Sequence, residues 1–139
     1  MTQASKEDQG IGVSNLLPYT RVYSDSSGET HFADEEMAFD LVDYAPPAPP
    51  ISVSGGVGAE SVTFISSPPE WFGDFHPAPR RQFIFVLAGE LEVEVSDGEA
   101  RRFGAGSVCL VEDTDGRGHI PRVTSGERGV AVAVPLVDK

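Results

Sequence analysis

The sequence of 139 residues contains one cysteine, Cys109. A single cysteine excludes an internal disulfide and a zinc site built from several thiolates. Basic residues are also scarce, because Lys and Arg total 10 against 22 Asp and Glu, which gives a formal net charge of −12. Nucleic acids and anionic membrane surfaces are themselves polyanions, so this charge balance argues against both as partners.

Long apolar stretches are missing as well. No run approaches the ~20 apolar residues needed to span a bilayer, and residues 1–10 lack the apolar segment of a secretory signal. We therefore expect a cytoplasmic protein whose partner is a small molecule or another protein. The length is that of one ordinary domain, and a hydrophobic content of 40% is enough for one core.

Helical periodicity is weak throughout the chain. The best candidate for a turn or two of helix is 34–42, and the prolines of 45–50 would stop any helix there. We expect 45–50 to be an extended linker over the surface. We also expect 1–15 to be a flexible tail, and 16–139 to be a single domain.

Short segments with β patterning are abundant. Residues 90–96 alternate between apolar and acidic side chains, and 82–87 is apolar on both faces, as in a strand buried on both sides. Asp97-Gly98 is a strong hairpin turn. Further predicted strands are 60–66, 100–103, 107–112 and 129–134, with an N-terminal hairpin of 19–23 and 30–32. Strands that recur at roughly 8 to 12 residues predict an all-β sandwich or barrel.

Residues 71–123 carry two motifs that resemble those of the cupin family. The first family motif runs from a glycine through His-x-His and a glutamate to a second glycine, and here it lies between Gly73 and Gly89. His76 falls on the first histidine of the pair, whereas Ala78 replaces the second histidine and Gln82 replaces the glutamate.

The second motif also matches in part. Gly106 and His119 fit its ends, but Glu112 replaces a proline and the loop before His119 is longer than in the family. The resemblance implies a double-stranded β-helix, or jelly-roll, barrel. In this chain an N-terminal β-hairpin and the proline-rich segment would precede the barrel.

The resemblance also implies a divalent metal site, and the substitutions weaken it. Typical cupins bind iron, manganese, nickel or zinc through three histidines and a glutamate. Here His76 and His119 remain, and Gln82 offers only a neutral carbonyl oxygen. The metal is then weakly bound or absent, unless Glu112 or Asp113 on the longer loop supplies a replacement carboxylate.

Two imidazoles in one cavity have a use without a metal. We expect His76 and His119 to act as an acid–base pair and Gln82 to orient a substrate carbonyl. Such a pair suits isomerisation, dehydration or cyclisation of a small organic or polyketide-like molecule. The alternatives are a metal-dependent cupin oxygenase, a non-catalytic cupin that binds a small ligand, and purely structural roles for the three residues.

The alternation in 82–87 gives the expected lining of the cavity. If Gln82 faces inward, Ile84 and Val86 line the cavity while the intervening side chains point outward. The outward face and the N-terminal hairpin are compatible with the homodimers that cupins commonly form.

Three more residues are candidates for substrate binding. Trp71 and Phe75 are expected as a lid. Arg81 would bind a substrate carboxylate, or else form a solvated ion pair with an acidic side chain. Cys109, within a predicted strand, is expected to be a buried small hydrophobe.

Overall fold

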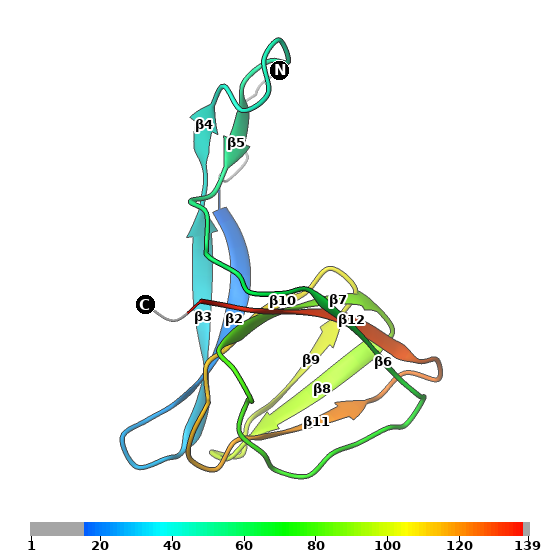
Figure 1. Ribbon diagram of the computed structural model, residues 1–139. Coiled ribbons are helices and arrows are strands. Elements are labelled where there is room, and N and C mark those ends of the chain that lie inside the picture. The colour runs from blue at the N-terminus through cyan, green and yellow to red at the C-terminus, as the bar shows by residue number, and fades with distance from the viewer. Residues whose placement is uncertain (1–15, 138–139) are drawn as a thin grey trace, which may run out of the picture. The chain divides into compact units, whose positions relative to one another are not determined.

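The computed structural model describes residues 16–137, and their regular structure is entirely β (Figure 1). This confirms the all-β prediction. The described part of the chain divides into two compact units, residues 16–18 with 36–56 and residues 19–35 with 57–137. The tail predicted for 1–15 lies outside the described residues.

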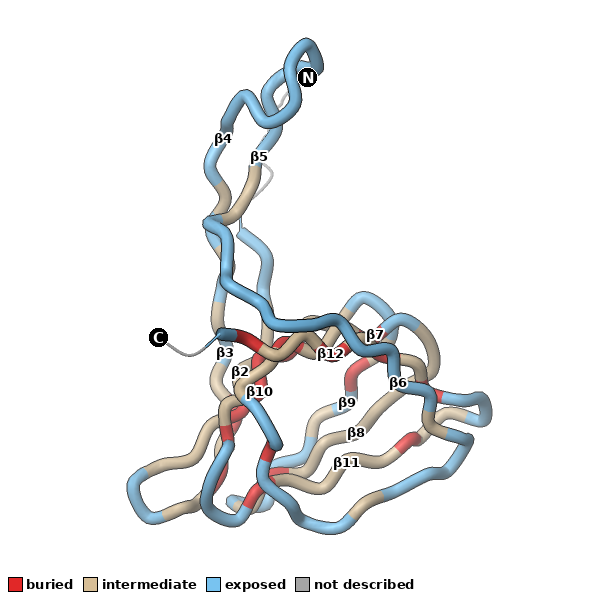
Figure 2. The backbone as a smooth tube through the Cα atoms, viewed as in Figure 1, coloured by how far each residue is buried: buried red, intermediate tan, exposed pale blue. Residues whose placement is uncertain are grey.

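The smaller unit contains the hairpin of β4 (Asp40–Val42) and β5 (Ile51–Val53), which pair antiparallel. The proline-rich segment 45–50 is exposed, as expected, but it joins these two strands and turns the chain back instead of extending it. Figure 2 shows the exposure of this hairpin.

The helix predicted for 34–42 is wrong. Residues up to Ala38 belong to β3 (Thr30–Ala38), and β4 follows almost directly. The apolar residues Met37, Phe39 and Leu41 are spaced by two positions, which is the period of a strand and not that of a helix.

A six-stranded sheet has the order β3-β2-β10-β7-β12-β6. The remaining bounds are β2 (Leu16–Ser24), β10 (Val108–Val111), β7 (Gln82–Ala88), β12 (Gly129–Pro135) and β6 (Thr63–Ser67). β2 pairs parallel with β10, while β7 pairs antiparallel with both β10 and β12. The predicted N-terminal hairpin is confirmed as β2 and β3, with strands longer than expected.

A three-stranded sheet, β11-β8-β9, completes the larger unit. It consists of β11 (His119–Val123), β8 (Glu90–Val95) and β9 (Ala100–Gly104). The alternation predicted for β8 holds: Leu91 and Val93 pack against the core, while Glu92 forms an ion pair with Arg122 of β11.

The core gathers side chains from both sheets. Its buried members are Val22, Phe32, Ala78, Val86, Val95, Phe103, Cys109 and Val111. Strands of both sheets also line a cavity that shares several residues with this core.

The larger unit supplies every residue of the site described below. Residues 16–137 contain no helix that is long and apolar enough to cross a bilayer.

Candidate functional site

The cavity has a volume of about 220 Å³. All four positions that the cupin resemblance matched to metal ligands line it, namely His76, Ala78, Gln82 and His119. The sequence comparison thus identified residues from three separate segments that meet around one space.

His76 and His119 are joined through their backbones. The amide of His76 donates to the carbonyl of His119 at 3.1 Å, and the amide of His119 donates to the carbonyl of His76 at 3.0 Å. The centres of their rings lie 5.0 Å apart, with an angle of 51° between the ring planes. The main chain therefore fixes the separation of the two backbone positions from which the imidazoles extend.

Gly118 makes this bridge possible. A Cβ on Gly118 would lie 2.1 Å from the carbonyl carbon and oxygen of His76, and its φ of +79° is in the left-handed region that favours glycine. Any larger residue at this position would push the two segments apart.

Asp113 orients the ring of His119. Its Oδ2 lies 2.6 Å from Nδ1 of His119, and the aspartate side chain is completely buried. Since a carboxylate only accepts, Nδ1 carries the proton and Nε2 is the ring nitrogen left for a ligand. Sequence reasoning considered Asp113 only as a replacement metal ligand and missed this role.

His76 is held in a similar way at the exposed rim of the cavity. Its Nδ1 lies 2.8 Å from the backbone carbonyl of Asp74, which can only accept a hydrogen bond. Nε2 is again the nitrogen left for a ligand, so both imidazoles have the same tautomer when neutral.

Gln82, Ile84 and Val86 line the cavity from β7, as the alternation predicted. Phe83, between them, points to the other face and packs against Tyr19, with ring centres 6.0 Å apart. Trp71 also lines the cavity, whereas Phe75 is exposed and is not among its lining residues.

Arg81 is not a lining residue either. Its Nε donates to Oε2 of Glu112 at 2.6 Å, and Nε of Arg21 donates to Oε1 of the same carboxylate at 2.5 Å. Burial acts to raise the pKa of Glu112, but the hydrogen bonds from Arg81 and Arg21 outweigh it and leave the pKa below its usual range. This geometry corresponds to the ion-pair alternative for Arg81, and it occupies both oxygens of Glu112.

The donor set does not fit the metal centre that the resemblance implies. Among residues 16–137, no three His, Cys, Asp or Glu side chains converge as metal ligands. Glu112 is held by two arginines and the Asp113 carboxylate by His119, so neither completes a set with His76, Gln82 and His119.

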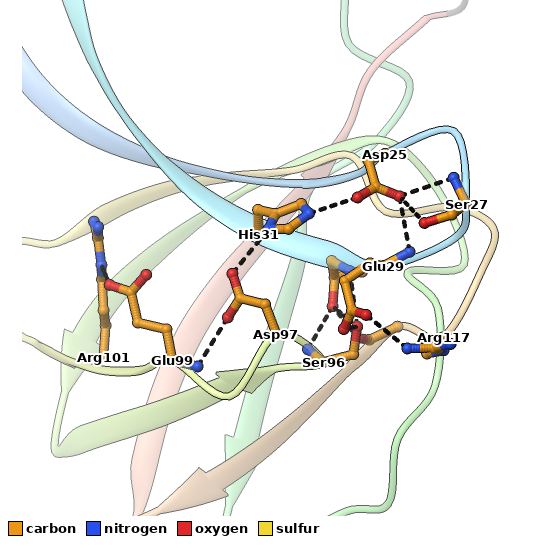
Figure 3. Close-up of polar contacts among 11 residues, drawn as sticks. Asp25, Ser27, Glu29, His31, Ser96, Asp97, Glu99, Arg101 and Arg117 are labelled. Atoms are coloured by element: carbon orange, nitrogen blue, oxygen red, sulfur yellow. Dashed lines mark hydrogen bonds and ion pairs between the residues drawn. The ribbon is translucent and has the colours of Figure 1, made fainter.

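A network of polar contacts supports the loop before His119. Thr30 is completely buried and its hydroxyl donates to the carbonyl of Gly118 at 2.7 Å, while the amide of Ser96 donates to the Thr30 hydroxyl at 2.7 Å. Glu29 accepts from Ser96 and from Arg117 (Figure 3). The β2–β3 turn thus braces the site from outside the cavity, which no local sequence pattern indicated.

His31 lies in the same network, between two carboxylates. Its Nε2 is 2.7 Å from Asp25 and its Nδ1 is 2.8 Å from Asp97 (Figure 3). The hydrogen bonds from Asp25 and then Asp97 raise the pKa of His31 above its ordinary value. No sequence motif includes His31, although both aspartates begin turn sequences.

Cys109 is a buried lining residue, as expected. Burial raises the pKa of its thiol to about 12, so the thiolate nucleophile is scarce near neutral pH.

Comparison with known proteins yields structural similarities only. No family model matches the sequence, and no curated protein matches it. A conserved protein of unknown function from Streptococcus pyogenes, SPY1581, aligns with a TM-score of 0.43 at 18% identity over 56% of this chain and 64% of its own. This chain therefore covers less than two thirds of that protein.

Two further solved structures are similar. Protein NMB1881 from Neisseria meningitidis aligns with a TM-score of 0.42 at 14% identity, covering 63% of this chain and 89% of its own. The cupin domain of Cnp3 from Schizosaccharomyces pombe aligns with a TM-score of 0.44 at 11% identity, covering 90% and 86%. A cupin domain is thus among the structures similar to this chain, and none of these similarities assigns it a function.

Proposed function

We propose that the chain is a small-molecule enzyme that moves protons within its cavity, with His76 and His119 as the acid–base pair. The observation that carries this proposal is the pairing of two imidazoles at 5.0 Å in the wall of a cavity. In each ring Nδ1 is occupied by an acceptor of the protein, which leaves Nε2 of both for a ligand.

The chemistry follows from this arrangement. A neutral imidazole can take a proton from a carbon next to a carbonyl, while a protonated one delivers a proton elsewhere on the same molecule. Asp113 is a positioning residue that holds His119 in the tautomer needed for this step. The amide of Gln82, also in the wall, would donate to the substrate carbonyl. Isomerisation, dehydration and cyclisation all contain such a transfer.

Exchange of carbon-bound protons tests the proposal before the substrate is known. We expect the protein in D₂O to accelerate deuterium uptake by enolisable ketones such as phenylacetone, measured by loss of the α-proton NMR signal. His119→Gln and His76→Gln should each lower this rate at least about a hundredfold, the usual scale of general acid–base catalysis.

Arg102→Gln is the control, because the side chain of Arg102 is mostly exposed and does not line the cavity. This variant should exchange ketone protons at the wild-type rate, measured at a pH at which it is folded. Equal rates for the wild type and the His76→Gln/His119→Gln double variant over a panel of ketones would contradict the proposal and favour a non-catalytic binding protein.

A further inference from the structure

Among the described residues, the wall of the cavity holds no carboxylate, ammonium or guanidinium group. None of the described residues that line it is Asp, Glu, Lys or Arg. An ion that entered would lose its hydration and find no fixed counter-charge, which is costly in a partly dry site.

Two arginines next to lining residues of the cavity, Arg21 and Arg81, supply no counter-charge to a ligand, because both are already paired with a carboxylate. Arg21 of β2 and Arg81, the residue before β7, share the carboxylate of Glu112, which follows β10. The side chains of all three lie outside the cavity lining. A carboxylate ligand in the cavity therefore cannot pair with either guanidinium unless Glu112 is displaced.

The polar groups of the wall gather at one end. Gln82 begins β7 and is in register with Val111, the last residue of β10. Two residues later Asp113 contacts His119, and His119 is bridged to His76.

The opposite end is mostly apolar. It is lined by Val86, Leu91, Gly129 and Ala131, where Ser67 in register with Gly129 contributes the one hydroxyl. The size of the space adds a limit, since about 220 Å³ is below the ~300–1,000 Å³ typical of pockets for drug-sized molecules.

We propose that the cavity takes an uncharged small molecule with one polar end, a carbonyl or carboxamide, and a compact apolar body. The polar end meets the imidazoles and the amide of Gln82, and the body fills the apolar end. This inference rests on the proposed function only in using the same cavity; it concerns which molecule binds and not what happens to it.

Three nearly isosteric probes separate charge from shape: benzamide is neutral, benzoate is an anion and benzamidine is a cation. Binding is followed by NMR shifts of the protein at about pH 8, where benzoate and benzamidine are both ionised and benzamide is neutral. We expect benzamide to bind at least about tenfold more tightly than either ion, with shifts at residues of the cavity wall.

Variants on one strand establish that the cavity is the place of binding. Ala131→Leu fills the wall of the cavity and should abolish benzamide binding. Val132→Leu adds volume at the neighbouring residue, which is not a lining residue, and should leave binding unchanged. Thermal unfolding of both variants verifies that they are folded.

The outcomes are distinguishable from those of the proton-transfer experiment. Tighter binding of benzoate or benzamidine, or binding of none of the three at millimolar concentration, would overturn the inference about the ligand. The neutral preference should survive in His119→Gln, which lacks proton transfer. A His119→Gln variant that no longer exchanges ketone protons but still prefers benzamide would thus support the proposed function without changing the inference about the ligand.

Discussion

Gly118 lies where the segment carrying His76 meets the start of β11. The approach is so close that a methyl group would overlap the main chain of His76. The carbonyl of Gly118 is also the acceptor for the buried hydroxyl of Thr30. Gly118 therefore connects the imidazole pair to the β2–β3 turn through its backbone carbonyl.

Gly118→Ala should break this junction. We expect the free energy of unfolding to fall by about 2 kcal/mol or more, because strain at a positive φ and backbone overlap add. The exchange of ketone protons should fall as well. Denaturant unfolding measures the first effect. Gly126→Ala is the control, since a Cβ there meets no atom within 4 Å; an equal loss in both variants would refute the role of Gly118.

At the scale of elements, the β2–β3 turn is fastened to the β8–β9 turn. His31 belongs to β3, Asp25 to the turn before it, and Asp97 to the turn after β8. The ring of Tyr23 lies 5.5 Å from that of His31. A protonated imidazole donates to both carboxylates, whereas a neutral one donates to only one of them.

This contact should make stability depend on pH. The folded pKa of His31 is raised, so its contribution is complete below the unfolded value of ~6.5 and is lost as pH rises through the higher folded value. The pKa of Asp25 is lowered, first by the hydrogen bond from His31 and then by that from Ser27. The contribution of Asp25 is therefore present above ~3.9 and lost as pH falls.

His31→Gln tests the dependence. The difference in Tm between the wild type and this variant should be largest between about pH 4 and 6.5 and should shrink above that range. Arg102→Gln is the control, because it removes an exposed ion pair with Glu92 that does not titrate there. A constant difference for His31→Gln from acidic to alkaline pH would contradict the assignment.

At the scale of the whole molecule, the homodimer expected from the sequence stays a prediction. β7 presents Leu87 on its outward side with 51% of the residue exposed, and Phe64 of β6 is 71% exposed. We expect light scattering after size exclusion to give the mass of two chains, and Leu87→Gln to lower the dimer fraction without lowering the stability of one chain. A wild-type mass of one chain at micromolar concentration would contradict the prediction.

The sequence predicted strands and turns correctly where their formation depends on neighbouring residues in the chain. The alternation in β8 and the turn Asp97-Gly98 are examples, since side-chain period and positive φ are local properties. The helix predicted for 34–42 was wrong because the apolar residues there recur at every second position, which is the period of a strand.

Partners that are distant in sequence could not be predicted in this way. The parallel pairing of β2 with β10 and the attachment of Arg81 to Glu112 depend on how the sheet assembles. The motif comparison brought His76, Gln82 and His119 to one cavity, yet it offered Asp113 only as a replacement metal ligand and did not include Thr30. Asp113 contacts the ring of His119, and Thr30 donates to the carbonyl of Gly118 just before it.

The two mutual hydrogen bonds between His76 and His119 use only main-chain atoms. The separation of the two main-chain segments is thus a property of the scaffold and does not depend on which side chains these positions carry. Any side chain that replaced the imidazole of His119 would meet the buried carboxylate of Asp113. The bridge therefore makes this fold a frame for other pairs of side chains, provided that Asp113 is changed to match.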